Sequence, residues 1–122
     1  MGHAYRAPAV GARGRYNAVV RYLVQLLVPL YDNSGTAFPR DLFAHTRGEL
    51  IDKFGGLTAY TRAPARGVWK ADDGEVARDD IAIFEVMAEA LDRAWWSEYR
   101  ATLEQRFRQD EMVIRAMEVE QL

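Results

Sequence analysis

The chain has 122 residues, enough for one domain with a buried core and too few for a second domain of similar size. Hydrophobic residues make up 49% and charged residues 28% of the sequence, which is typical of a folded globular chain rather than a disordered one. The formal net charge of -2 gives no overall bias toward nucleic acid or an anionic membrane, and the lack of cysteine excludes disulfides, thiolate metal sites and cysteine nucleophiles.

The N-terminal end of the chain differs in composition from the rest. Residues 1–15 are rich in Ala, Gly, Pro and Arg and show no periodicity. We expect a flexible tail there, followed by a single domain at 16–122.

The first element is an apolar run. Tyr22–Leu30 is fully apolar on one strand face and mostly apolar on the other, which predicts a strand that is covered on both sides. The wider run Val19–Leu30 is interrupted by Arg21 and Gln25 and falls short of the roughly 20 residues that a membrane-spanning helix needs. No cleavage site of small residues follows, so the sequence favours a cytoplasmic protein with no membrane association.

The second element is a helix predicted over Arg40–Phe54, which a pair of glycines ends. Pro39 suits the first helical position, where a missing backbone N–H does no harm. Thr46 and Glu49 match a capping box, and Gly48 is unfavourable inside a helix. These features predict that the helix breaks and restarts near its middle.

Two extended stretches follow around a turn. Leu57–Ala71 and Glu75–Ala88 flank the Asp-Gly pair at 73–74, a strong hairpin pattern. Pro64 lies within the first stretch, which therefore indicates a bent edge strand. The second stretch alternates most regularly over Ile81–Ala88, as expected of a strand.

The last two elements are a helix and a strand. Asp92–Gln109 is amphipathic, with Asp92 as its expected N-cap. Its apolar stripe is Leu91, Trp95, Tyr99, Leu103 and Phe107. Trp96 lies beside the apolar stripe, where it either points outward as a contact residue or packs against the first helix. Met112–Val119 is the final predicted strand.

The resulting order, β-α-β-β-α-β, predicts an α+β domain of the ferredoxin-like type, with an antiparallel sheet and both helices on one of its faces. The less uniformly apolar side of each strand then forms the other face. Its expected members are Leu23, Gln25, Leu27, Tyr60, Arg62, Ile81, Ile83, Glu85, Met87, Val113, Arg115, Met117 and Val119. An apolar face of this size predicts a homodimer in which a second copy covers it.

Four polar residues in this apolar set are the candidate ligand-binding residues: Gln25, Tyr60, Glu85 and Arg115. A charge among aliphatic side chains has to be paired or shifted in pKa. One interpretation is an interface salt bridge between Glu85 and Arg115, with Gln25 bonding the backbone or its own symmetry mate. The other is a pocket for a small, polar-headed ligand. In an enzyme, Glu85 would be the base, and Arg115, Gln25 and Tyr60 would orient an oxyanion.

No other pattern assigns a site. The sequence has no phosphate loop, nucleotide fingerprint, zinc-protease motif or serine-hydrolase elbow. The acidic segment 72–80 lacks the ligand spacing of a calcium loop, and His45 is expected at the surface near Asp41 and Glu49. The aromatic and basic residues of the edge strand lack the motif of an RNA-binding sheet. The sequence therefore predicts no metal, no cofactor and no nucleic acid partner, and it assigns no catalytic residue.

Short motifs in the first half of the domain resemble a known group of proteins. Phe54-Gly55-Gly56-Leu57-Thr58, Gly67-Val68-Trp69 and Glu75 look like a pattern in small bacterial ferredoxin-like proteins of unknown function. The resemblance implies a fold and a dimer rather than an activity. Some families of dimeric α+β barrels are cofactor-independent oxygenases, and others bind heme through a histidine, which is absent from the sheet face here. The leading prediction is a homodimeric ligand-binding or interaction protein that uses this face. The alternative is a cofactor-independent enzyme, oxygenase- or isomerase-like, that acts on a small organic substrate.

Overall fold

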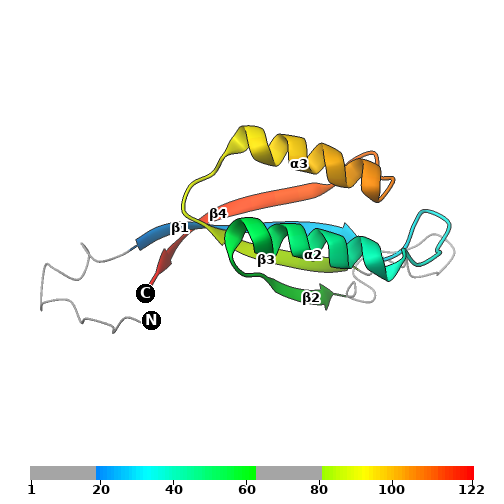
Figure 1. The fold of residues 1–122 in the computed structure, drawn as a ribbon, viewed down its shortest axis with the longest axis horizontal. Coiled ribbons are helices and arrows are strands. Elements are labelled where there is room, and N and C mark those ends of the chain that lie inside the picture. The colour runs from blue at the N-terminus through cyan, green and yellow to red at the C-terminus, as the bar shows by residue number, and fades with distance from the viewer. Residues whose placement is uncertain (1–18, 63–80) are drawn as a thin grey trace, which may run out of the picture.

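The computed structural model describes residues 19–62 and 81–122, and their elements follow the order β-α-β-β-α-β, as predicted. The tail at 1–15, the Asp-Gly turn at 73–74 and the acidic segment 72–80 lie outside the described residues. The elements are β1 (Val19–Pro29), α2 (Arg40–Phe54), β2 (Thr58–Arg62), β3 (Ile81–Ala88), α3 (Arg93–Arg106) and β4 (Val113–Gln121) (Figure 1).

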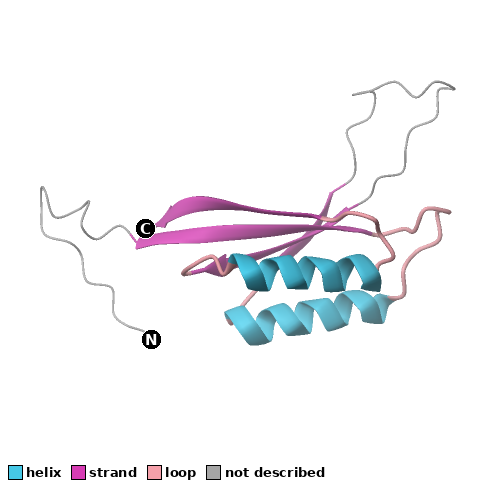
Figure 2. Cartoon of the chain, turned by 90° about the horizontal axis from the view of Figure 1, so that it is seen from above, coloured by secondary structure: helices cyan, strands magenta, loops and turns pink. Residues whose placement is uncertain are grey.

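The four strands form one antiparallel sheet in the order β2-β3-β1-β4. Both helices lie on one side of this sheet, as Figure 2 shows. The predicted ferredoxin-like α+β fold is therefore confirmed. Strand β1 lies between β3 and β4, and the described helices cover only one of its two apolar faces (Figure 2), so the predicted covering of the other face stays a prediction. We call the side of the sheet that no described helix covers the open face.

The hydrophobic core lies between the helices and the sheet. Val24, Leu26 and Val28 of β1 alternate toward the helices and are almost fully buried. Leu26 lies opposite Phe84 on β3 and Ile114 on β4, so the helix-facing sides of three strands are in register. The helices contribute Leu50, Trp96, Tyr99, Leu103 and Phe107 to the same core.

Helix α2 has the predicted bounds but not the predicted break. It runs without interruption from Arg40 to Phe54, and Pro39 is its N-cap rather than its first helical residue. Thr46 does not cap a second helix, because its hydroxyl donates to the carbonyl of Leu42 one turn earlier, at 2.8 Å. At the C-terminal end Gly55 adopts φ +84°, and its N–H donates to the carbonyl of Ile51. This left-handed residue ends the helix, as predicted.

Helix α3 begins where predicted, because the Asp92 carboxylate accepts a hydrogen bond from the N–H of Trp95 at 3.1 Å. Of the two interpretations of Trp96, packing against the first helix is confirmed. Trp96 is buried and stacks on Phe54, whereas Trp95 is only partly buried. A stripe of every fourth residue drifts around a helix with 3.6 residues per turn, so the buried side passes through Trp96 and Leu103.

Candidate functional site

The register of the sheet places the predicted residues together on the open face. Gln25 on β1 lies directly opposite Glu85 on β3 and Arg115 on β4. Tyr60 on β2 pairs with Ile83, one position along the same face. We call Gln25, Tyr60, Glu85 and Arg115 the polar row. Its residues come from all four strands, so only the folded sheet brings them together.

The polar row is one continuous chain of hydrogen bonds. Arg115 Nε donates to Gln25 Oε1 at 2.8 Å, and Gln25 Nε2 donates to Glu85 Oε2 at 2.6 Å. The Tyr60 hydroxyl donates to the same Glu85 Oε2 at 2.9 Å. The two neighbours thus fix the orientation of the Gln25 amide, with its oxygen toward the cation and its nitrogen toward the carboxylate.

Within one chain Glu85 and Arg115 do not pair, because Gln25 lies between the two charges on the central strand, so the salt bridge between two copies stays a prediction. Glu85 and Arg115 are separated by two strand spacings, which amounts to roughly 10 Å. Among the described residues, nothing bonds to Glu85 Oε1 or to the terminal nitrogens of Arg115. The row therefore presents a free acceptor at one end and free donors at the other.

The hydrogen bond to Glu85 also controls the ionisation of Tyr60. It raises the pKa of the Tyr60 phenol above its ordinary value, because ionised Tyr60 would lose this bond and place a second negative charge beside the carboxylate. Tyr60 therefore remains a hydrogen-bond donor at neutral pH and above.

Exposed apolar side chains flank the polar row on both sides. Met87 and Met117 lie in one direction along the strands, and Val113 lies in the other. Their exposed fractions are 43%, 44% and 50%, high values for large hydrophobic side chains. Ile83, at the centre of the face, is only 2% exposed. The open face is thus an apolar surface with one organised polar row across it.

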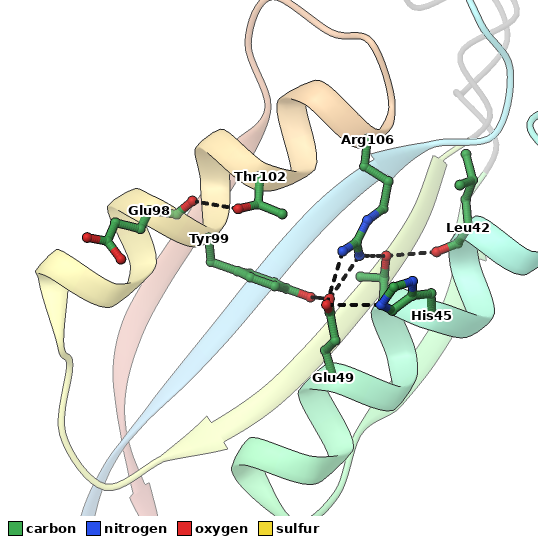
Figure 3. Close-up of polar contacts among 8 residues, drawn as sticks. Leu42, His45, Glu49, Glu98, Tyr99, Thr102 and Arg106 are labelled. Atoms are coloured by element: carbon green, nitrogen blue, oxygen red, sulfur yellow. Dashed lines mark hydrogen bonds and ion pairs between the residues drawn. The ribbon is translucent and has the colours of Figure 1, made fainter.

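A second polar cluster lies between the helices, and sequence reasoning missed it (Figure 3). Arg106 on α3 forms a bidentate pair with Glu49 on α2, with N···O distances of 2.8 and 3.0 Å. The Tyr99 hydroxyl donates to Glu49 Oε1 at 2.9 Å, and His45 Nε2 lies 3.2 Å from Glu49 Oε2. Arg106 also donates to the hydroxyl of Thr46 at 2.8 Å. We call this group the interhelical cluster.

The interhelical cluster is self-contained. The bond from Arg106 lowers the pKa of Glu49, and the same bond raises the pKa of Arg106. Burial, followed by the bond to Glu49, raises the pKa of Tyr99. Each Glu49 oxygen already has two partners, so the cluster joins α2 to α3 and offers no free group to a ligand. Two local patterns lie within it, the i,i+4 spacing of His45 and Glu49 and the capping-box spacing of Thr46 and Glu49, and neither indicates a contact with the second helix.

Two further polar residues, Asp32 and His45, lie outside the polar row and are not arranged as a site. Asp32 Oδ1 accepts hydrogen bonds from the N–H groups of Ser34 and Thr36 and from the Ser34 hydroxyl, which stabilises the turn between β1 and α2. His45 is largely exposed, as expected. In the part of the chain that the structure describes, no group of three or more His, Asp or Glu residues could hold a metal ion. No helix within 19–62 or 81–122 is long and apolar enough to cross a membrane.

Comparisons with known proteins show the fold alone. No protein-family model and no curated protein matches the chain. Among solved structures, the chain is similar to a phage SAM lyase in complex with S-methyl-5'-thioadenosine, with a TM-score of 0.55 and 9% sequence identity. The similarity covers 84% of this chain and 85% of the lyase chain. It agrees with the ferredoxin-like arrangement described above.

Proposed function

We propose that this protein is a cytoplasmic bacterial homodimer that binds a small, polar-headed molecule at its open sheet face. The observation that carries the proposal is the polar row, an organised chain of four side chains that crosses an exposed apolar surface. Organised polar groups within an apolar surrounding are the usual composition of a ligand site.

The exposed apolar side chains around the polar row support the proposal that a second copy of the chain covers the open face. Met87, Val113 and Met117 come from two strands on either side of β1, so the exposed surface extends across the sheet. Monomers rarely leave such a surface exposed to water. Burial of apolar surface contributes a favourable free energy of about 25 cal/mol per Å², which favours association. A space closed between two sheets would keep the polar row away from bulk water.

The free groups of the row define the ligand chemistry. Arg115 offers its terminal nitrogens to an acceptor, and Glu85 Oε1 accepts from a hydroxyl or amino group. S-methyl-5'-thioadenosine carries both kinds of group. Because the structural neighbour is described in complex with it, this nucleoside is the first probe to test.

Light scattering coupled to size-exclusion chromatography tests the dimer. We expect a species of about twice 13.9 kDa for the wild type and a monomer for Met117→Arg, which places a charge at an exposed position of the open face. Ile83 is unsuitable because a charge at this buried position would disturb the monomer itself. Ala101→Arg, on the exposed side of α3, is the matched control and should remain dimeric. A monomeric wild type at tens of micromolar would overturn the proposal.

Isothermal titration with S-methyl-5'-thioadenosine, followed by a screen of nucleosides and small carboxylic acids, tests the binding. We expect Arg115→Gln to weaken the binding of any ligand that the wild type binds at this face by roughly tenfold, about 1.4 kcal/mol, at protein concentrations where light scattering still shows the dimer. Unchanged binding in this variant would remove the polar row from the site.

The geometry of Glu85 supports a second candidate, a cofactor-independent enzyme. Two donors hold Oε2, which fixes the carboxylate and leaves Oε1 free to take a proton from a substrate. Incubation of the protein with SAM and chromatographic detection of S-methyl-5'-thioadenosine tests the reaction named for the structural neighbour. Turnover that Glu85→Gln abolishes would favour this enzyme. Binding without turnover would favour the binding protein.

A further inference from the structure

A cavity lies on the helix side of the sheet, opposite the open face, between helix α2 and strand β2. Its volume is about 350 Å³. The side chains on the helix side of the edge strand β2 are small, Ala59 and Thr61, and Thr61 pairs with another small residue, Ala82 on β3. Small side chains at a sheet edge leave a gap beneath the helix that a tightly packed interior would fill. We call this gap the α2–β2 groove.

The floor of the groove is apolar. Phe84 and Ala82 are 2% and 5% exposed, and Leu30 and Phe43 are partly buried against the same core. Tyr60 directs its side chain to the open face, where it donates to Glu85, so only its main chain borders the groove. A ligand here would rest on aromatic and aliphatic surface.

Two arginines border this apolar floor. Arg40 and Arg47 are seven residues apart on α2, which places them two turns apart on one side of the helix, with Phe43 between them. Neither forms an ion pair within the described residues, whereas Arg21, Arg100, Arg106 and Arg108 do. The groove therefore combines an apolar floor with two positive charges that no carboxylate of residues 19–62 or 81–122 pairs.

This combination matches one ligand chemistry. The volume lies within the range of small-molecule sites, and a planar guanidinium binds a carboxylate through two parallel hydrogen bonds. We propose that the α2–β2 groove binds a small carboxylic acid whose apolar body lies on Leu30 and Phe43 and whose carboxylate contacts Arg40 and Arg47. This site goes beyond the function proposed above, because it lies on the helix side of the sheet and uses none of the polar-row side chains.

The other half of the fold contains a related groove that serves as a control. Arg93, Trp96 and Arg100 on α3 repeat the spacing of Arg40, Phe43 and Arg47, and they border a cavity beside β4. That cavity is smaller, about 240 Å³, and Arg100 lies 3.8 Å from Glu104, which partly compensates its charge. Both helices thus carry the same arginine spacing, but only the α2 side offers the larger volume and two free charges.

The test is isothermal titration of the full-length protein with 2-naphthoate and octanoate, and with their neutral amides. We expect saturable binding of the carboxylates, and binding of the amides weaker by roughly tenfold, about 1.4 kcal/mol. The double variant Arg40→Ala/Arg47→Ala should bind the carboxylates at least about tenfold more weakly than the wild type does. The matched double variant Arg93→Ala/Arg100→Ala should bind within about twofold of the wild type.

Ala59→Phe provides a second arm, because it fills the groove and leaves both arginines in place. We expect it to abolish carboxylate binding while circular dichroism remains that of the wild type. Should this variant fail to fold, the two arginine variants still decide the matter. Absence of saturable binding to the wild type, or equal losses in the α2 and α3 double variants, would overturn the proposal.

Discussion

Glu49 is the residue on which the polar contact between the two helices depends. Its carboxylate binds Arg106, Tyr99 and His45, and Arg106 is only 13% exposed. Glu49→Gln would leave the Arg106 cation largely buried without a counter-charge. We expect a loss of about 1–2 kcal/mol in the free energy of unfolding, a value reduced for the partial exposure of Glu49. Urea denaturation at pH 7 measures it, and Glu98→Gln on the exposed side of α3 should change little.

The same pair predicts a pH dependence. Arg106 holds the pKa of Glu49 below its ordinary value of 4.5, so folding favours the ionised carboxylate. This contribution is fully present above the unfolded-state pKa and is lost as the pH falls through the lowered folded-state pKa. The stability difference between wild type and Glu49→Gln should therefore shrink as the pH falls below about 4.5, where the carboxylate of the wild type becomes protonated. A difference that grows on acidification would contradict this assignment.

These residues also show how far the sequence predicts a site. The placement of Gln25, Glu85 and Arg115 follows from strand parity, since side chains two apart share a face. Their hydrogen bonds do not follow, because the order of the strands decides that Gln25 separates the two charges. The Glu49–Arg106 pair joins residues 57 positions apart on different helices, and no local spacing encodes such a contact.

For the helices and strands, the sequence predicts the bounds that the hydrophobic periodicity marks. The bounds of α2 and the end of β3 at Ala88 agree with the apolar pattern, whereas β4 ends at Gln121, beyond that pattern, and β1 includes Val19. Val19 pairs with Gln121 through the backbone, which forms a ladder whatever the polarity of the side chains. In α2 the capping-box pattern predicted a break, but the core packing of Leu50 and the bonding of Thr46 favour one continuous helix.

Replacing Gly48 within α2 and Gly55 at its C-terminal end by alanine should change the stability in opposite directions. Gly48 lies inside the helix, and a Cβ there would meet no atom within 4 Å. Gly48→Ala should raise the free energy of unfolding by about 0.5–1 kcal/mol, because it reduces the freedom of the unfolded chain. Gly55 has equal space but φ +84°, so Gly55→Ala should lower it by about 1 kcal/mol or more. Thermal unfolding of both variants measures the contrast, and a destabilising Gly48→Ala would contradict the continuous helix.

For the whole molecule, the charge order along the polar row fits a second copy of the same chain. Arg115, Gln25 and Glu85 lie across three neighbouring strands as positive, neutral and negative. In the proposed homodimer a two-fold axis along β1 would reverse this order, so that Arg115 of one protomer would face the partner's Glu85 across the space proposed for the ligand, with the two Gln25 residues nearest the axis. Burial of Arg115 needs a counter-charge, and within the sheet strands Glu85 is the carboxylate on the open face.

Charge reversal tests this arrangement directly. Glu85→Arg alone places two arginine pairs across the proposed interface, and Arg115→Glu alone places two glutamate pairs there. We expect each single variant to weaken dimerisation at least roughly hundredfold. When the two variants are mixed, every cross-interface pair regains opposite charges, so a heterodimer should form at wild-type concentrations, and the double variant should form a homodimer. Native mass spectrometry of the mixture distinguishes the species. If the wild type is dimeric but the two single variants do not associate on mixing, the two-fold axis along β1 is excluded and the dimer is retained. If the wild type is monomeric, both the axis and the dimer are excluded.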